Sequence, residues 1–165
     1  MKRPNSSMQL TRAADYAVRV MVQLAASPIE QRVLLPELAA ATDAPVSFLS
    51  KVLQALSRAE LIDSKRGHAG GFYISNRGRQ ASMLDVIEAI DGPILLNICL
   101  VSGKSCHRKA HCPAHPVWER AQMAMLNVLS QAKIAQMAEE QADQHCTGNC
   151  GHDNLALFGR KVAAG

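Results

Sequence analysis

Three cysteines in the second half of the sequence, Cys99, Cys106 and Cys112, are the residues best suited to inorganic chemistry. Thiolates are the usual ligands of iron–sulfur clusters and of structural zinc. The gaps between these cysteines are six and five residues long, wider than the two-residue gaps typical of zinc sites. The intervening residues are polar and include Gly103, so the segment can wrap around a larger centre. The spacing therefore predicts an iron–sulfur cluster with the three cysteines as its metal ligands.

Neighbouring residues could complete such a site. His111 and His115 lie close enough in the sequence to supply a fourth ligand. Lys104, Arg108 and Lys109 can offset the negative charge that thiolates and sulfides bring together. The rival interpretation is a loop with three free thiols.

A weaker signal comes from Cys146 and Cys150, which stand beside His145 and His152 in a polar tail. This group could bind zinc, exchange disulfides with the loop, or remain as free thiols. The chain has five cysteines in all, an odd number that favours thiols and metal ligands in a reducing compartment over a disulfide framework.

Motifs of enzymes are not evident in the sequence. It shows no nucleotide-binding glycine loop, paired-carboxylate site or serine–histidine nucleophile. His107 directly follows Cys106, but adjacent side chains rarely face each other productively. We therefore expect a protein that is not an enzyme.

The elements that position these residues begin with three helices. Apolar residues recur at helical spacing across residues 11–26, where Thr11 can act as the N-cap. A short helix is expected over residues 35–42, and residues 43–45 break it. A third helix, which is amphipathic, follows from about Ser47, and Ser47 can serve as its cap. Its expected buried positions are Leu49, Val52, Leu53 and Leu56.

Two β-prone segments, residues 61–64 and 72–75, come next and flank a glycine-rich turn. The three glycines of this turn supply the positive φ angles that a hairpin needs. A hairpin directly after two helices joined by a tight turn is a wing. The order of elements therefore predicts a winged helix-turn-helix over residues 8–80.

Seven residues are candidates for contacts with double-stranded DNA. In a helix-turn-helix, the second helix enters the major groove with its N-terminal residues. Gln54 can form two hydrogen bonds with adenine, and Lys51 suits a phosphate. The set is Ser47, Phe48, Ser50, Lys51 and Gln54 on the helix, with Arg66 and His68 on the wing.

The charge distribution favours the same partner. Residues 1–80 contain 11 Lys and Arg against 6 Asp and Glu, whereas residues 81–165 contain 7 against 8. A basic N-terminal half is typical of proteins that contact a polyanion, so operator DNA is the expected partner.

The second half is expected to join the cysteine loop to a dimer. A helix over residues 82–90 begins with Ser82 and Asp85 placed as a capping box. The longest periodic segment, residues 116–142, predicts one helix with more apolar surface than a small domain can cover. A second copy of the chain is its expected partner. The predicted units are the DNA-binding domain 8–80, a linker helix and cluster loop 81–115, a dimerisation helix 116–143 and a flexible tail 144–165.

Composition agrees with a mainly helical fold that carries one small β-hairpin. Hydrophobic residues make up 48% of the chain and aromatic residues only 4%, a balance that favours packed helices over a large sheet. No stretch has the apolar length of a signal peptide or a membrane span, which predicts a cytoplasmic protein without membrane contact.

Four segments taken in order resemble the Rrf2 family of transcription regulators. They are residues 8–16 (MQLTRAADY), residues 66–71 (RGHAGG), the three-cysteine loop and residues 112–118 (CPAHPVW). The resemblance covers residues 8–142 and implies a homodimer built around a long C-terminal helix, with a 2Fe–2S or 4Fe–4S cluster on the cysteine loop of several members. In such proteins loss, oxidation or nitrosylation of the cluster changes operator affinity, which implies a sensor of redox state, iron or nitric oxide.

The resemblance leaves two residues open as the fourth ligand. Asp15 matches the position where some members use an aspartate that reaches across from the other subunit. His115 matches the position where others use a histidine. The glutamate with which the family reads DNA is Ser50 here, so that base contact is not carried over.

Two other functions fit the same residues. The first is a cluster-free transcription regulator whose thiols sense oxidants by forming a disulfide. The second is a metal-carrying or catalytic adaptor that uses its winged fold for protein contacts. Salt-insensitive binding to DNA, or no binding, would favour it.

Overall fold

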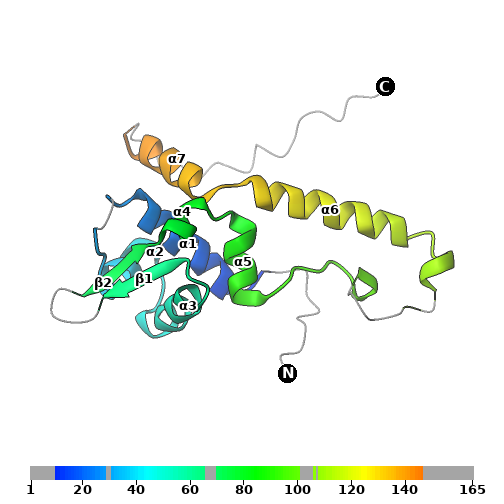
Figure 1. Cartoon of the computed structure of the whole chain (residues 1–165), viewed down its shortest axis with the longest axis horizontal. Helices are drawn as coiled ribbons and strands as arrows, with labels where there is room; N and C mark the ends of the chain where they lie inside the picture. Colours follow the sequence, from blue (N-terminus) through cyan, green and yellow to red (C-terminus); the bar gives the residue numbers. More distant parts are fainter. Residues whose placement is uncertain (1–9, 29–30, 66–69, 101–105, 107, 147–165) are drawn as a thin grey trace.

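The computed structural model describes residues 10–28, 31–65, 70–100, 106 and 108–146. The predicted mainly helical fold with one two-stranded hairpin is confirmed (Figure 1). The helices are α1 (Arg12–Ala26), α2 (Leu35–Thr42), α3 (Val46–Arg58), α4 (Asn76–Gln80), α5 (Met83–Asp91), α6 (His115–Gln131) and α7 (Ile134–Cys146), and the strands are β1 (Ile62–Lys65) and β2 (Gly71–Ile74). Two short 3-10 helices, Ile98–Leu100 and Lys109–His111, lie between α5 and α6.

The core is built around α1, which buries residues on nearly all of its length. Helices α2, α3, α5 and α7 all pack against it. The largest fully buried side chains are Met21, Leu24, Leu38, Leu49, Leu53, Leu56, Leu61, Ile62, Ile87, Ile134, Val20 and Val86. These elements and the hairpin form the body of the molecule (α1–α5, β1, β2 and α7). Burial of this many aliphatic side chains is the main source of its stability. Figure 1 shows α6 extending away from that body.

The beginning of α1 is tied to the end of α5. Thr11 is the N-cap of α1, as predicted, and its hydroxyl oxygen accepts the N–H of Ala14 at 3.2 Å. The same hydroxyl donates to Asp91 Oδ1 at 2.7 Å, and the Thr11 N–H donates to Asp91 Oδ2 at 3.2 Å. The last residue of α5 therefore fixes where α1 begins.

The turn between α2 and α3 departs from the predicted start of α3. Asp43 takes the left-handed conformation, with φ of 52°, and closes α2. The prediction that Ser47 caps α3 is wrong, because α3 begins at Val46 and is preceded by Pro45 in an extended conformation. The Pro45 carbonyl accepts the N–H groups of Phe48 and Leu49 at 3.0 and 2.9 Å. Proline fixes φ near the value needed here, so the helix starts without a side-chain cap.

The hairpin forms where predicted, with each strand displaced by one residue. Antiparallel pairing runs from Ile62 opposite Ile74 to Lys65 opposite Gly71. Val33, which precedes α2, forms an isolated antiparallel bridge with Phe72 of β2, with hydrogen bonds of 2.9 and 3.0 Å. A Cβ on Gly71 would lie only 3.1 Å from the Val33 carbonyl oxygen. This close approach explains why glycine begins β2.

The predicted single helix over residues 116–142 is wrong, since α6 ends at Gln131 and α7 begins at Ile134. The backbone at the break pairs with the start of α5 instead of continuing the helix. Met83 N–H donates to the Ala132 carbonyl at 2.8 Å, and Ile134 N–H donates to the Ala81 carbonyl at 3.0 Å. This pairing turns α7 back onto α1, so α7 belongs to the body and only α6 extends from it.

The predicted capping box at the start of α5 is confirmed. Asp85 Oδ2 accepts the N–H and the hydroxyl of Ser82 at 2.7 and 2.6 Å, while Asp85 N–H donates to Ser82 Oγ at 3.2 Å. These bonds, of which the one from the Ser82 hydroxyl has the largest effect, lower the pKa of Asp85 below its ordinary value of 3.8. Because Ser82 also lies at the break between α6 and α7, the box stabilises that junction.

A lowered pKa in the folded state predicts a pH-dependent contribution to stability. The contribution of Asp85 is complete above its unfolded pKa and is lost as the pH falls through the lower folded value. Asp85→Asn should reduce the free energy of unfolding by about 1 kcal/mol at neutral pH. The difference from the native protein should shrink below about pH 3.8. Urea titrations of both proteins between neutral and acid pH measure it, and a difference that grows on acidification would contradict the assignment.

Candidate functional site

Most of the residues predicted to contact DNA lie on an uncovered face of α3. Ser47, Phe48, Lys51 and Gln54 are exposed, whereas Ser50 is half-buried. The Ser50 hydroxyl donates to the Val46 carbonyl at 3.1 Å. The opposite face of α3 buries the four predicted core positions, Leu49, Val52, Leu53 and Leu56.

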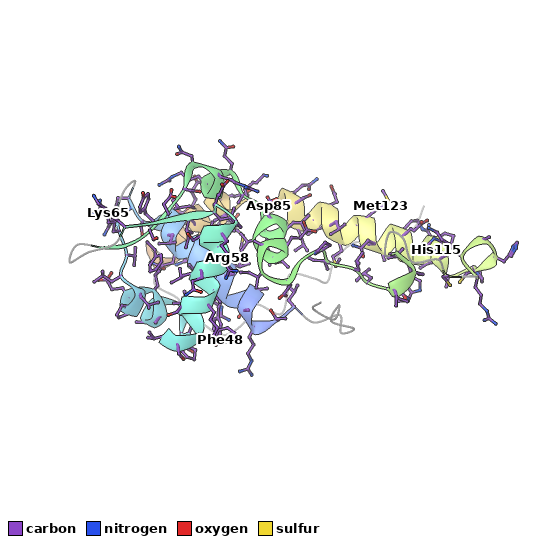
Figure 2. All side chains as sticks on the ribbon, turned by 60° about the horizontal axis from the view of Figure 1, so that its bottom comes forward. Phe48, Arg58, Lys65, Asp85, His115 and Met123 are labelled. Carbon is purple, nitrogen blue, oxygen red and sulfur yellow. The ribbon has the colours of Figure 1, made fainter. Side chains whose placement is uncertain are left out.

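The aromatic ring of Phe48 is held at the beginning of this face (Figure 2). It packs edge-on against Tyr16 of α1, with 5.6 Å between ring centroids and 70° between ring planes. Arg19 places its guanidinium 5.8 Å from the centre of the Tyr16 ring. Phe48 nevertheless remains 37% exposed. The ring is therefore supported from behind and available in front.

A shallow groove of about 430 Å³ separates α3 from the wing. Ser50 and Gln54 line it together with Arg58, which is not among the seven predicted DNA contacts. Arg58 is exposed, and its Nε donates to the Gln54 carbonyl at 3.2 Å. The signal available in the sequence was spacing, because Arg58 follows Gln54 by four residues and so shares its helix face.

The wing contributes an exposed lysine, Lys65, as the last residue of β1 (Figure 2). Arg66 and His68, the two predicted wing contacts, lie outside the described residues.

The three cysteines of the loop are half-buried free thiols. Cys99 lies in the first 3-10 helix, and Cys112 directly follows the second. Cys106 accepts the Lys109 N–H on its carbonyl oxygen at 2.9 Å. Across the described ranges, no three His, Cys, Asp or Glu side chains lie close enough together to hold a metal ion. The loop thus supplies the thiols without gathering them.

His115, the first residue of α6, is buried to 7% exposure at the far end of this helix (Figure 2). Its N–H donates to the Cys112 carbonyl at 3.1 Å, so the two residues share one turn. Nε2 lies 3.1 Å from Glu119 Oε1 without the alignment of a hydrogen bond, and neither ring nitrogen is hydrogen-bonded in the described structure. Buried polar nitrogens are normally hydrogen-bonded, so this imidazole has unused capacity to bind another group. Three thiols and such an imidazole form a donor set that fits an iron–sulfur cluster.

Asp15 has the opposite surroundings. It lies on α1 in the body, about half exposed, and forms an ion pair with Arg19 at 2.9 Å. Figures 1 and 2 place α1 well away from the His115 end of α6. The structure therefore does not bring Asp15 and His115 together within one chain.

Most apolar residues of α6 lie on two faces, and Met123, which is 70% exposed, lies on neither. Trp118, Met125 and Leu129 are half-buried. The exposed apolar seam comprises Val117, Ala121, Ala124 and Val128, of which the two valines are 53% and 65% exposed. Its spacing of four, three and four residues is that of a coiled-coil seam, and the central alanines permit close approach. No helix in the described ranges is long and apolar enough to cross a membrane.

Comparisons with known proteins agree on one family. The Rrf2 family model, described as an iron-dependent transcriptional regulator, matches residues 10–140. A putative HTH-type transcriptional regulator of Mycobacterium tuberculosis is 32% identical over 138 residues, which cover 84% of this chain and 86% of the relative. The HTH-type transcriptional regulator NsrR of Geobacillus kaustophilus is 28% identical over 136 residues, covering 82% and 92%.

Solved structures show the same fold. CymR, the global cysteine regulator of B. subtilis, aligns with a TM-score of 0.65 at 20% identity, covering 80% of this chain and 97% of CymR. IscR of T. potens aligns with a TM-score of 0.63 at 22% identity, covering 82% and 90%. At these identities the likeness concerns the fold alone.

Proposed function

This chain belongs to the Rrf2 family of transcriptional regulators, and from that premise we propose that it acts as a homodimer whose operator affinity depends on an iron–sulfur cluster. The proposed ligands are Cys99, Cys106, Cys112 and His115. The observation that carries the proposal is the buried imidazole of His115, whose nitrogens have no hydrogen bond in the described structure and which lies one turn from Cys112.

Burial favours His115 over Asp15 as the fourth ligand. Both side chains have a partner of opposite charge type four residues away, Glu119 for His115 and Arg19 for Asp15. The Asp15 carboxylate is half exposed, whereas the His115 imidazole is buried with no hydrogen bond to either nitrogen, which is costly unless it binds a further group. Asp15 could reach the loop only from the other subunit, in line with its place in the body. A histidine ligand is compatible with a 2Fe–2S cluster, in which histidine replaces cysteine in known proteins.

A bound cluster would supply an iron centre that reacts with oxidants or nitric oxide and that is lost when iron is scarce. The chain's own residues would hold and shield it. Arg108 and Lys109 are exposed beside the cysteines, where they offset the charge of the thiolates. The cysteines themselves must move closer together, since they are not gathered in the described structure.

For DNA binding, we propose that the exposed face of α3 enters the major groove. Gln54 can read adenine, Lys51 and Arg58 suit phosphates, and Ser47 can bond either. Arg66 and His68 remain the proposed contacts of the wing with the backbone or minor groove. The basic N-terminal half supports this orientation, as it places positive charge on the DNA-binding unit.

The proposed dimer forms through α6 alone. The predicted dimerisation segment 116–143 included residues of α7, which pack on α1 of the same chain. The exposed apolar seam on α6 supplies the surface for a second copy. Two copies then present two recognition helices to half-sites about one turn of DNA apart.

The proposal is tested on protein purified without oxygen. Iron and acid-labile sulfide should be present in stoichiometric amounts, and the visible absorption should be that of a cluster. Binding to the protein's own promoter region should change by about 5- to 150-fold when the cluster is removed. A colourless protein whose DNA affinity ignores reconstitution with iron and sulfide would refute the proposal.

The position of Phe48 yields a prediction about base recognition. A supported, exposed ring at the start of α3 suits the 5-methyl group of thymine. Replacing that thymine by uracil should weaken binding about fourfold per half-site, because burial of one methyl group contributes about 0.8 kcal/mol. Phe48→Ala should weaken binding to the thymine operator by at least as much and should not respond to uracil. Ser47→Ala is the control: it leaves the ring in place, so its affinity should still fall about fourfold when uracil replaces the thymine.

The affinity is measured by fluorescence anisotropy on a series of short operator duplexes, in each of which uracil replaces a different thymine. Native protein that binds every uracil duplex as tightly as the thymine operator would exclude methyl recognition by Phe48.

A second candidate function is a thiol switch without a cluster. The half-exposed free thiols of Cys99, Cys106 and Cys112 favour it. Two of these thiols would give two protons and two electrons to hydrogen peroxide, forming one disulfide and two water molecules. Iron-free native protein whose operator binding responds to peroxide would support this candidate over the cluster.

A further inference from the structure

Helix α6 buries a glutamine on the face that contacts the cysteine loop. Gln122 is only 8% exposed, whereas Val117, Met123 and Val128 of the same helix are more than half exposed. Its carboxamide binds the backbone of the segment that leaves α5. Leu96 N–H donates to Gln122 Oε1 at 2.8 Å, and Gln122 Nε2 donates to the Ile94 carbonyl at 2.6 Å. One side chain thus pairs with this segment as a neighbouring strand would.

These two bonds fix the segment along the helix axis. Figures 1 and 2 show it running beside α6 toward the His115 end. Gln122 lies seven residues after His115, which is two helical turns or about 10 Å on the same face. Cys99 follows Leu96 by three residues and lies in the 3-10 helix Ile98–Leu100 at the end of this segment. Pairing at Gln122 therefore sets how far along α6, toward the end that carries His115 and Cys112, Cys99 lies.

We propose that Gln122 is a positioning residue that sets the register of the cysteine loop on α6 and thereby holds Cys99 beside the other ligands. This inference rests on the proposed cluster function. Gln122 is placed too far along α6 to bind the cluster itself, and it acts through the backbone of residues 94–96. Both of its polar ends are used, so a one-residue slip of the segment breaks both bonds at once.

The first measurement needs no cluster. Amide hydrogen exchange at Leu96 reports the bond to Gln122 Oε1 directly, in native protein and in Gln122→Leu. Exchange should accelerate about five- to thirtyfold in the variant. Gln136→Leu, which makes the same change at an exposed glutamine on α7, should match the native protein. Unchanged Leu96 exchange in Gln122→Leu overturns the proposal.

A conservative variant separates positioning from general packing. In Gln122→Glu, an ionised carboxylate can accept from Leu96 but cannot donate to the Ile94 carbonyl. A protonated carboxyl can donate, so Leu96 protection should recover as the pH falls through the titration of the introduced acid. A purely structural cavity effect would give no such recovery, and its absence would count against the proposal.

The second measurement follows the reconstituted cluster during transfer to a chelator. Loss should be about five- to thirtyfold faster in Gln122→Leu than in native protein or Gln136→Leu. The absorption bands should keep their positions, because the ligands are unchanged. Equal rates of loss overturn the positioning role even if Leu96 exchange changes. Native protein that binds no cluster overturns the proposed function instead, and the Leu96 measurement still decides whether Gln122 fixes the segment.

Discussion

Cys112→Ala should abolish cluster binding and, with it, the response of operator affinity to reconstitution. Cys112 joins the second 3-10 helix to α6, and its carbonyl accepts the N–H of His115, so two proposed ligands are held by one short stretch of backbone. Removing this thiol takes away the ligand whose position is best fixed. Iron and sulfide should fall to background, and the ratio of operator affinities with and without reconstitution should fall from about 5–150 to about one.

The matched control is Cys146→Ala, which makes the same change outside the loop, at the end of α7. It should retain native iron, sulfide and DNA response. Full iron and sulfide in Cys112→Ala would contradict the assignment of Cys112 as a ligand. A native protein without iron, whose peroxide response disappears in Cys112→Ala, would identify the thiol switch as the function.

Val128→Lys should convert the dimer to monomers. Val128 is 65% exposed at one end of the seam, where two copies of α6 are proposed to meet. A lysine there would place an unpaired charge, facing its copy, in an apolar contact. We expect the dimer dissociation constant to rise about a thousandfold, which corresponds to about 4 kcal/mol. Operator binding should weaken as well, because a monomer reaches a single half-site.

Sedimentation velocity over a range of concentrations measures this change. Asn127→Lys is the control, since it introduces the same charge at the neighbouring exposed position outside the seam. The body should remain folded in both variants, because Val128 lies outside the buried core. Equal dissociation constants for the two variants would show that the seam is not the dimer contact.

The sequence predicts those parts of the fold that depend on local signals. Thr11 as a cap, the Ser82 and Asp85 box and the hairpin all follow from residues a few positions apart, and all are present. The start of α3 was missed by one residue because Pro45 provides it without a side-chain cap.

The break between α6 and α7 could not be read from the sequence. Neither proline nor glycine marks residues 132–133, and apolar residues keep their helical spacing on both sides. The break depends on pairing with residues 81–83, which are distant in the sequence. Short α4 was also missed, because its five residues include Gly78 and lack apolar periodicity.

The candidate site divides in the same way. Residue types and spacing identify Cys99, Cys106 and Cys112 as thiols near one another along the chain, but not how far they are gathered in space. The choice between His115 and Asp15 depends on burial, which needs the tertiary structure. Because Gln122 is polar, the sequence indicates an exposed position on the helix. Only the folded chain shows that its side chain is buried against two backbone partners.

The two-residue joint at Ala132 and Lys133 gives α6 the mechanics of a lever. Its 17 residues make an arm of about 25 Å, with the pivot held against α5 and the cysteine loop at the free tip. A displacement of about 4 Å at the tip equals a rotation of about 10° at the pivot over such an arm. If α6 is clamped to its copy, the bodies that carry α3 must turn by that angle instead. A displacement of a few ångströms is comparable to the rise of one base pair, about 3.4 Å. A rotation of this size can therefore shift α3 by about one base pair relative to its half-site.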